Sequence, residues 1–489
     1  MNVFYIVLSC VLACLTILTL ILKLIVFKNN ENFKNAINKT LKIIAVCYCS
    51  FMIVSLLLPD AFKLCLSESD LSSMTKNYGY IIIRWFSMVN FVILPLAMFY
   101  KSPTMRNIAL LFCLPVSIAS IFFYPQFIND FCSSAGRGIN SISVVSQDIK
   151  NFLINPTFRS ILLGGVLTLQ IFMPICQAIN EKRFFYFENK KDITYFLICL
   201  PLIILSSIPI YVPQYLFGYS NMIFKAYGWI HIGWLIIVIL EIITLYFIFR
   251  KKDENTKMIL LFVLSLSLLM QYNQMFSAIS INLKRLPLQL CNIGAFLILI
   301  SLITKNKKIF NFTAIINVVG VLFALAVPDL EGKGLFYLYN MHFIFEHSNV
   351  IIVPILALML NIFPRLDKYA LRDCLIGFSI YFCFVWALGT TFNAIATSTG
   401  NNFYEVNFLF MFLPKVATDL LPFTKALFDI NFKIGSATFY PVLQLIVYLV
   451  FVTVCIVLYF TIKLIYKLKD KIMNKQNNSY QSPPTTQAD

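Results

Sequence analysis

Apolar runs of about 20 residues recur along almost the whole chain, separated by short segments that carry most of its Lys, Arg, Pro and Gly residues. Each run is long enough to cross about 30 Å of hydrocarbon as a helix. Only 12% of the 489 residues are charged and 59% are hydrophobic, which excludes a water-soluble globular protein, whose charged share is about twice as large. The sequence therefore predicts an all-α polytopic membrane protein.

Hydropathy, charge and Pro/Gly punctuation together predict thirteen transmembrane helices. The first should be a retained helix rather than a signal peptide, because it lacks a basic leader and a small-residue cleavage site. The polar tail at 470–489 predicts disorder. The expected helices lie near 3–27, 41–59, 78–99, 107–124, 158–178, 193–212, 227–249, 258–280, 286–304, 309–327, 348–363, 375–395 and 438–466.

Lys and Arg residues are distributed unevenly between the connections. About twice as many fall on one set of alternate connections, which includes 250–257 and 305–308, as on the other set. Because cytoplasmic loops carry the excess of positive charge, we expect a multi-pass protein of the plasma membrane with its N-terminus outside and its C-terminus in the cytoplasm. These loops account for the net charge of +17, so nucleic acid is not an expected partner.

The two halves of the chain look alike, which suggests two similar six-helix units, one in 1–214 and one in 215–469, where the C-terminal helix near 438–466 is additional. Such units would form a parallel repeat about an axis along the membrane normal. Hydrophobic helices also resemble one another by composition alone, so that alternative stays open. The aligned stretches are RWFSMVNFVILPLAMFYKSPTMRN from Arg84 with RLPLQLCNIGAFLILISLITKNKK from Arg285, the run ends at Tyr124 and Val327, and the segments from Phe158 and Phe345.

Histidine is the sharpest chemical signal in the sequence. The chain has three, His231, His342 and His347, and all lie in the second half, where the topology places them at outer helix ends or in the connection 328–347. Ionisable groups at membrane depth are costly and mark functional sites. A polar tip at a wet boundary is the alternative for each of them.

Cys291 and His347 form a candidate catalytic pair. Most of the 13 cysteines lie inside apolar runs, and their spacing matches neither a disulfide framework nor a zinc site. Cys291 is expected six residues into its helix, about 9 Å below the outer boundary, and His347 opens the next helix from that side. An imidazole that takes the thiol proton leaves a thiolate able to attack an ester carbonyl. A packed apolar cysteine is the alternative.

Polar residues near Cys291 are candidates for substrate binding. Arg285, Gln289 and Asn292 share one stripe of the expected helix, and Arg285 could hold a lipid phosphate or simply extend to the membrane boundary. With His231 and His342 they complete the candidate substrate-binding set. No phosphate loop, metal-binding His pair or serine-hydrolase elbow appears, so the sequence predicts neither a cofactor nor a bound metal.

Four segments of the second half carry a family resemblance. They are GWIHIGWLIIVIL around His231, LPLQLCNIGAFLILISLITKNKK around Cys291, the VPDL turn at Pro328, and FIFEHSNVIIVPI around His347. Over about residues 215–466 the chain resembles the YwaF-like integral membrane family of bacteria and its animal relatives, transmembrane acyltransferases that make ether phospholipids. The resemblance implies that Cys291 carries an acyl-thioester and that His347 is its base. The first half would be a degenerate copy.

Three functions compete. The first is a membrane-embedded lipid acyltransferase that uses Cys291 and His347, with membrane lipids, including an acyl-donor lipid, as its partners. The second is a secondary transporter, because one large transporter class is built from two parallel six-helix repeats. The third is a non-catalytic membrane scaffold.

Overall fold

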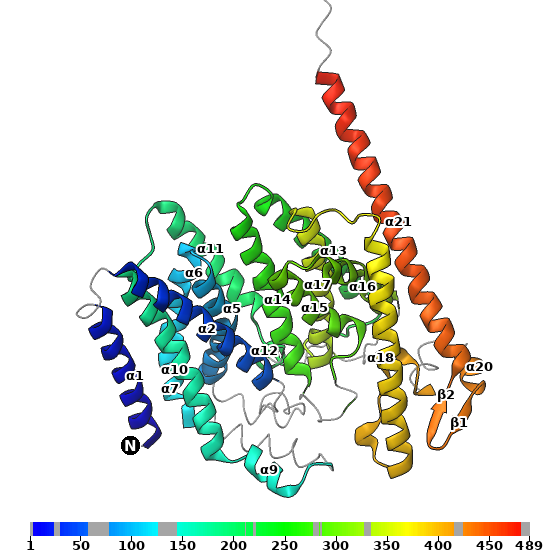
Figure 1. Cartoon of the computed structure of the whole chain (residues 1–489), viewed down its shortest axis with the longest axis horizontal. Coiled ribbons are helices and arrows are strands. Elements are labelled where there is room, and N and C mark those ends of the chain that lie inside the picture. The colour runs from blue at the N-terminus through cyan, green and yellow to red at the C-terminus, as the bar shows by residue number, and fades with distance from the viewer. Residues whose placement is uncertain are drawn as a thin grey trace, which may run out of the picture.

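The structure is a computed structural model of the whole chain, and it describes residues 3–23, 30–56, 78–125, 144–210, 212–218, 222–276, 283, 286–326, 334–414 and 424–480. Almost all of the regular structure is helical, and a single two-stranded hairpin is the exception among the described residues. The expected all-α class is therefore confirmed. The first-half helices lie on one side of the molecule and the second-half helices on the other (Figure 1).

The first half contains both long and short helices. The long ones are α1 (Val3–Ile21), α2 (Glu31–Leu56), α5 (Tyr78–Phe99), α10 (Pro156–Glu181) and α11 (Lys190–Ser206). A further crossing is made of three consecutive pieces: α6 (Pro103–Ile108), the π-helical turn η2 (Ala109–Cys113) and α7 (Leu114–Phe122). The short helices are α9 (Gln147–Leu153) and α12 (Val212–Phe217).

The second half contains seven long helices and a group of short elements between the last two of them. The helices are α13 (Trp229–Phe249), α14 (Glu254–Phe276), α15 (Leu290–Thr304), α16 (Lys307–Ala326), α17 (Leu338–Met359), α18 (Ala370–Thr399) and α21 (Pro441–Tyr480). Between α18 and α21 lie the 3-10 turns η4 (Asn402–Tyr404) and η5 (Phe408–Phe410), α20 (Thr424–Asp429), and the antiparallel strands β1 (Phe432–Ile434) and β2 (Ala437–Phe439).

Local sequence signals explain where several helices begin. Asn155 caps α10 by accepting from the backbone N–H of Thr157 and Phe158, and Pro156 occupies the first turn, where its missing N–H costs nothing. Asn189 and Asp192 form a capping box at the start of α11. These caps satisfy backbone donors that would otherwise be left without partners at a helix end.

Each of the thirteen expected helices has a helical counterpart, and nine of the described helices are long and apolar enough to span a membrane. Three boundaries differ by ten residues or more, and the first is the start of α2, which lies at Glu31 instead of 41. Helix α17 begins at Leu338, ten residues before the expected start, because Glu346 and its polar neighbours are satisfied inside the bundle. Helix α21 runs to Tyr480, so the expected disorder from Asp470 is corrected for 470–480, since extending an existing helix needs no new nucleus. Residues 481–489 lie outside the described residues.

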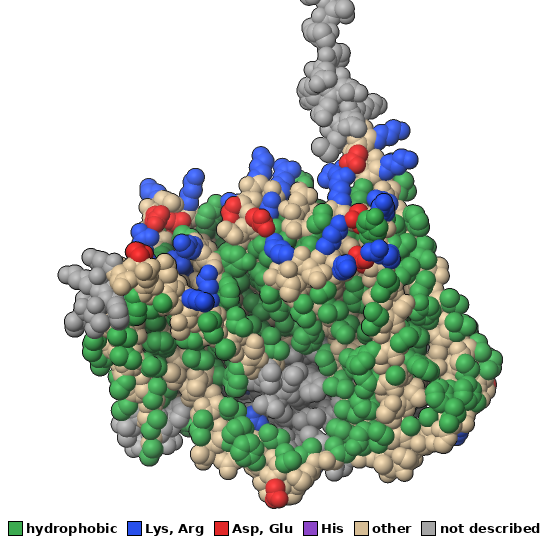
Figure 2. Space-filling view, in the orientation of Figure 1, with side chains coloured by type: hydrophobic (Ala, Val, Ile, Leu, Met, Phe, Trp, Pro, Cys, Tyr) green, Lys and Arg blue, Asp and Glu red, His purple; other side chains and the backbone are tan. Residues whose placement is uncertain are grey.

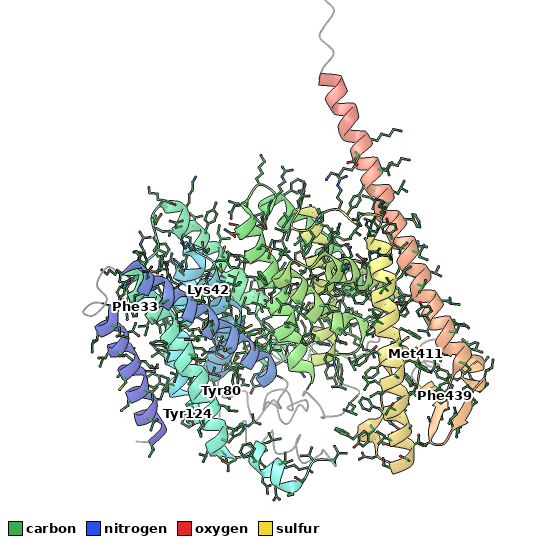
Figure 3. The ribbon with its side chains drawn as sticks, viewed as in Figure 1. Phe33, Lys42, Tyr80, Tyr124, Met411 and Phe439 are labelled. Atoms are coloured by element: carbon green, nitrogen blue, oxygen red, sulfur yellow. The ribbon has the colours of Figure 1, made fainter. Side chains whose placement is uncertain are left out.

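Helix contacts in the two halves correspond. In the first half, α5 packs on α2, α7 and α10, while α10 also packs on α1, α2 and α7. In the second half, α15 packs on α14, α16 and α17, while α17 also packs on α13, α14 and α16. Helix α14 packs against α5 and α2, and one hydrophobic core runs through both halves at that contact. Side chains fill the space between the helices (Figure 3).

Lys and Arg side chains gather along one edge of the molecule, and hydrophobic side chains cover the flank below it (Figure 2). We call this surface, formed by the turns at 250–252, 305–308 and 365–372, the basic edge. Ion pairs join its parts: Lys305 Nζ to Glu254 Oε1 at 3.0 Å, Lys307 Nζ to Asp367 Oδ2 at 2.6 Å, and Arg365 Nη1 to Asp470 Oδ1 at 2.9 Å. These ion pairs connect α14 to the end of α15, and they connect both α16 and α21 to the turn before α18.

Candidate functional site

Cys291 lies in the first turn of α15, at the end of the bundle opposite the basic edge. The helix begins at Leu290, with Gln289 as its N-cap, and ends at Thr304 beside the basic edge. The expected start at 286 and the depth of about 9 Å derived from it are therefore corrected, because residues 286–289 are not helical. Partial positive charge at a helix N-terminus favours an anionic sulfur at this position.

The sulfur of Cys291 faces α16 at Gly320. A Cβ added to Gly320 would lie 3.1 Å from Cys291 Sγ. Gly294, one turn further along α15, packs still more closely on the side chain of Asn317. Two glycines therefore allow α15 and α16 to approach each other around Cys291 and Asn317.

Glu346 is the centre of a buried polar cluster between α15 and α17. Its side chain is 4% exposed, and its Oε2 lies 2.9 Å from His342 Nε2, one turn earlier on α17. Asn292 Nδ2 donates to Glu346 Oε1 at 2.5 Å. Cys291 directly precedes Asn292 in the first turn of α15. The cluster links the helix that carries the thiol to the helix that carries two of the histidines.

Sequence reasoning missed Glu346 as a site residue. The available signal was an acid inside an apolar run, four residues after a histidine, where the two side chains lie on the same helical face. Its counterpart on α15 could not be identified from spacing, because the partner depends on how the two helices are rotated.

His347 follows Glu346 and is almost fully buried. Its Nδ1 lies 2.7 Å from the carbonyl oxygen of Phe343, which can only accept, so Nδ1 carries the proton and Nε2 is left as the acceptor. This is the tautomer that a general base needs. Among the described residues no hydrogen bond joins His347 to Cys291, and their approach within hydrogen-bond reach stays a prediction.

His231, the third histidine, is buried in an aromatic cluster on α13. The backbone N–H of Tyr227 donates to its Nδ1 at 3.0 Å, and its ring stacks on Trp234 with centroids 5.6 Å apart. Trp234 Nε1 in turn donates to Ser348 Oγ on α17 at 2.8 Å. These contacts tie α13 to α17 beside His347, a packing role that the sequence did not separate from substrate binding.

The expected polar stripe does not form one helical face. Gln289 Nε2 donates to the carbonyl oxygen of Asn407 at 3.1 Å, and its Oε1 accepts from the N–H of Leu409 at 3.1 Å, so both ends of this amide hold the turn after α18. Asn292 instead contacts Glu346. The stripe is corrected because the helix starts only after Gln289. Arg285 lies outside the described residues.

Asn317 of α16 was also missed by sequence reasoning. Its side chain is fully buried, and among the described residues neither its Oδ1 nor its Nδ2 has a hydrogen-bond partner. A buried polar group without a partner costs about 1–3 kcal/mol, so such groups are rare in folded proteins. The signal in the sequence was an Asn in the middle of an apolar run that also contains Asn311 near its start.

The aligned region of the first half holds a different polar chain. Asn90 Nδ2 donates to Ser117 Oγ at 3.1 Å, Ser117 Oγ lies 3.4 Å from Gln170 Oε1, and Gln170 Nε2 donates to Tyr48 OH at 2.9 Å. All four residues are buried. Arg159 at the start of α10 donates from Nε to the carbonyl oxygen of Leu153 at 2.6 Å. These groups join helices and include no nucleophile-and-base pair.

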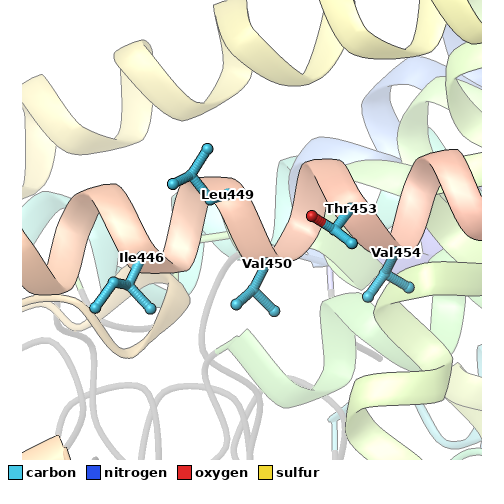
Figure 4. A pocket seen from close by; sticks show the side chains of 5 residues that line it. All are labelled: Ile446, Leu449, Val450, Thr453 and Val454. Carbon is cyan, nitrogen blue, oxygen red and sulfur yellow. The ribbon is translucent and has the colours of Figure 1, made fainter.

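A groove of about 270 Å³ lies on α21, lined by Ile446, Leu449, Val450, Thr453 and Val454, and holds no titratable group (Figure 4). Within the described part of the chain, no three His, Cys, Asp or Glu side chains lie close enough together to hold a metal ion.

Comparison with known proteins places the candidate site in the matched half of the chain. Residues 226–461 match the model of the TMEM164 family, a family of transmembrane proteins. The match covers just under half of the chain, from α13 into α21, and includes Cys291, Asn317, His342, Glu346 and His347. No curated protein and no solved structure matches the chain.

Proposed function

We propose that this multi-pass membrane protein is a lipid acyltransferase that forms an acyl-thioester on Cys291, with His347 as general base and acid. The observation that carries the proposal is the buried cluster around Glu346, which lies between apolar helices beside Cys291 and His347. Ionisable groups are rarely kept at such places without a function. The reaction class follows from the resemblance of the second half of the chain to transmembrane acyltransferases.

The chemistry assigns one step to each side chain. His347 Nε2 takes the thiol proton of Cys291, and the thiolate attacks the ester carbonyl of the donor lipid. His347 then returns the proton to the departing alcohol, and the acceptor lipid reverses the sequence. Glu346 touches no reacting atom in this scheme, so it is a positioning residue that holds His342 and Asn292 in place.

The charge distribution supports an orientation for this site. The basic edge carries the loops that the positive-inside rule assigns to the cytoplasm. Cys291 and His231 lie at the opposite ends of α15 and α13, and His347 lies near the middle of α17. We therefore place the reaction at the outer leaflet of the plasma membrane, with phospholipids as donor and acceptor.

The test is covalent labelling of the full-length protein in cells with an alkynyl fatty acid, together with lipid profiling. Wild type should acquire label that neutral hydroxylamine releases, as expected of a thioester. Cys291→Ala should lose it, and Cys291→Ser should label weakly because its hydroxyl depends wholly on a base. Cys176→Ala, which changes a buried cysteine of the first half, is the matched control and should label normally.

Two results would count against this function. Label that persists in folded Cys291→Ala protein would end the thioester hypothesis. Loss of label in Cys176→Ala but not in Cys291→Ala would mean that the reactive thiol lies in the other half.

A secondary transporter is the second candidate, and the corresponding helix contacts of the two halves are the observation that favours it. We infer that the halves are related by duplication, which both functions accommodate. Reconstitution into liposomes separates them: a transporter moves a solute across a sealed bilayer, whereas an acyltransferase changes lipid composition without a gradient.

A further inference from the structure

The carboxamide of Asn317 is a buried polar group of the second half whose hydrogen bonding the fold does not explain. It is fully buried on α16, and neither of its polar atoms has a partner among the described residues. A buried amide on this helix can be paired: Asn311 Nδ2, two turns earlier on α16, donates to Asp373 Oδ2 at 2.9 Å. Within the part of the chain that the structure describes, the carboxamide of Asn317 therefore keeps both a donor and an acceptor unused.

Asn317 lies one turn from the thiol at the same helix contact. Cys291 and Gly294 are three residues apart on α15, as are Gly320 and Asn317 on the antiparallel α16. Cys291 faces Gly320, and Gly294 faces Asn317. Three helical residues span about 4.5 Å, a distance that an acyl carbonyl on the sulfur and one hydrogen bond of about 2.9 Å to its oxygen cover together.

The first half indicates that the fold does not need an amide at this place. The alignment pairs Asn90 with Cys291 and Ser117 with Gly320, and Asn90 and Ser117 do contact each other across α5 and α7. It pairs Ile93 with Gly294 and Leu114 with Asn317, so there the next turn of the helix contact is apolar. The turn that corresponds to Gly294 and Asn317 is thus built in the first half without an amide.

We propose that Asn317 is a catalytic residue whose Nδ2–H donates to the carbonyl oxygen of the acyl group that reacts at Cys291. This rests on the proposed acyl transfer. As the sulfur bonds to the ester carbon, the π electron pair moves to the carbonyl oxygen, and Asn317 stabilises that oxyanion. The pair then returns, the bond to the lipid alcohol breaks, and the alcohol takes the proton that His347 removed from the thiol.

The experiment uses the full chain in nanodiscs with a phospholipid that carries an alkynyl acyl chain. Asn317→Leu should lower the rate of hydroxylamine-sensitive labelling by about 10²–10³-fold, the usual effect of removing one oxyanion donor. The fall should be in the maximal rate, with little change in the lipid concentration that gives half of it. The midpoint of thermal unfolding should stay equal or rise, because an unpaired buried amide is removed.

Asn311→Leu is the matched control on the same helix. It removes a paired amide far from the thiol, so it should lower the unfolding midpoint while folded protein labels at the wild-type rate. If Asn317→Leu does not fold, Asn317→Ala removes the same donor without the bulk.

The outcomes separate the two proposals. Labelling of Asn317→Leu or Asn317→Ala at the wild-type rate overturns the role of Asn317 and leaves the thioester intact. A fall in the unfolding midpoint with unchanged rate per folded molecule also overturns it, since the amide would then be structural. Label that survives in Cys291→Ala contradicts the acyltransferase itself.

Discussion

At the scale of single residues, the molecule is defined by a few polar groups inside an apolar bundle. Glu346 and Asn317 are both buried on neighbouring helices, yet the first contacts His342 and Asn292 while the second has no partner among the described residues. A buried hydrogen-bonded pair is costly to break because its remaining member stays desolvated. The two residues should therefore respond to substitution in opposite ways.

Glu346→Leu should lower the free energy of unfolding by about 3–5 kcal/mol, because it removes the carboxylate that faces both His342 and Asn292 in the interior. Glu254→Gln is the control, since Glu254 pairs with Lys305 at the exposed basic edge and should change stability by less than about 1 kcal/mol. Thermal unfolding in detergent micelles measures both. Equal shifts of the unfolding midpoint in Glu346→Leu and Glu254→Gln would show that burial of the Glu346 cluster adds nothing to stability.

At the scale of elements, glycines set how closely the helices approach. Gly377 on α18 packs against the ring of Phe312 on α16, and a Cβ added there would lie 2.8 Å from Phe312 Cδ2. Gly389 packs against Phe412 in the same way. Close packing of this kind compensates for the absence of a hydrophobic driving force between helices in lipid.

Gly377→Val should destabilise the protein by about 1–3 kcal/mol, because the new side chain forces α18 away from Phe312. Gly165→Ala on α10 is the matched change, since nothing lies within 4 Å of its added Cβ. It should be neutral or stabilising by up to about 1 kcal/mol, because Ala favours a helix over Gly. Thermal unfolding midpoints of both variants give the comparison. A Gly377→Val protein with the wild-type midpoint would refute the close contact between Gly377 and Phe312.

The ion pair between Lys307 and Asp367 joins the start of α16 to the turn before α18, outside the spans. Its hydrogen bond to Lys307 lowers the pKa of Asp367. A lowered folded-state pKa contributes stability that is complete above the unfolded value of about 3.9 and disappears as pH falls through the folded value. Both side chains are more than a third exposed, so the contribution is at most about 1 kcal/mol.

Asp367→Asn should therefore lower the unfolding midpoint slightly and equally at pH 7 and pH 5. The difference from wild type should vanish only well below pH 4, where Asp367 itself is protonated. Unfolding scans of both proteins over this range give the measurement. A difference that grew on acidification would contradict the direction of the pKa shift.

At the scale of the whole molecule, hydropathy predicted where the helices are but not what their polar residues contact. All thirteen expected helices have counterparts because each needs only a run of apolar residues. The start of α17 was misplaced because Glu346 and His347 look like a loop when their partners are unknown. Asn292 contacts α17, whereas Gln289 contacts the turn after α18. Which element each side chain meets depends on how the helices are rotated, and residue spacing in one sequence does not reveal that rotation.

The orientation of the whole molecule is tested by labelling single cysteines in a cysteine-free protein. Lys433→Cys, on the exposed hairpin, should react with an impermeant reagent added outside intact cells. Lys308→Cys, on the basic edge, should react only after permeabilisation, because positively charged loops stay in the cytoplasm. The reverse pattern would move the candidate site to the inner leaflet.

Helix α21 crosses the basic edge at Asp470, where Arg365 holds it, and continues without a break to Tyr480 (Figure 1). Its 40 residues give a rod of about 60 Å whose two ends must turn together. A change of about 10° in the tilt of the rod would displace its tip by about 10 Å relative to its base. The helix thus amplifies small changes in its own tilt. A distance probe near Tyr480 would therefore report rearrangements among the lipid-facing helices that are too small to measure where they occur.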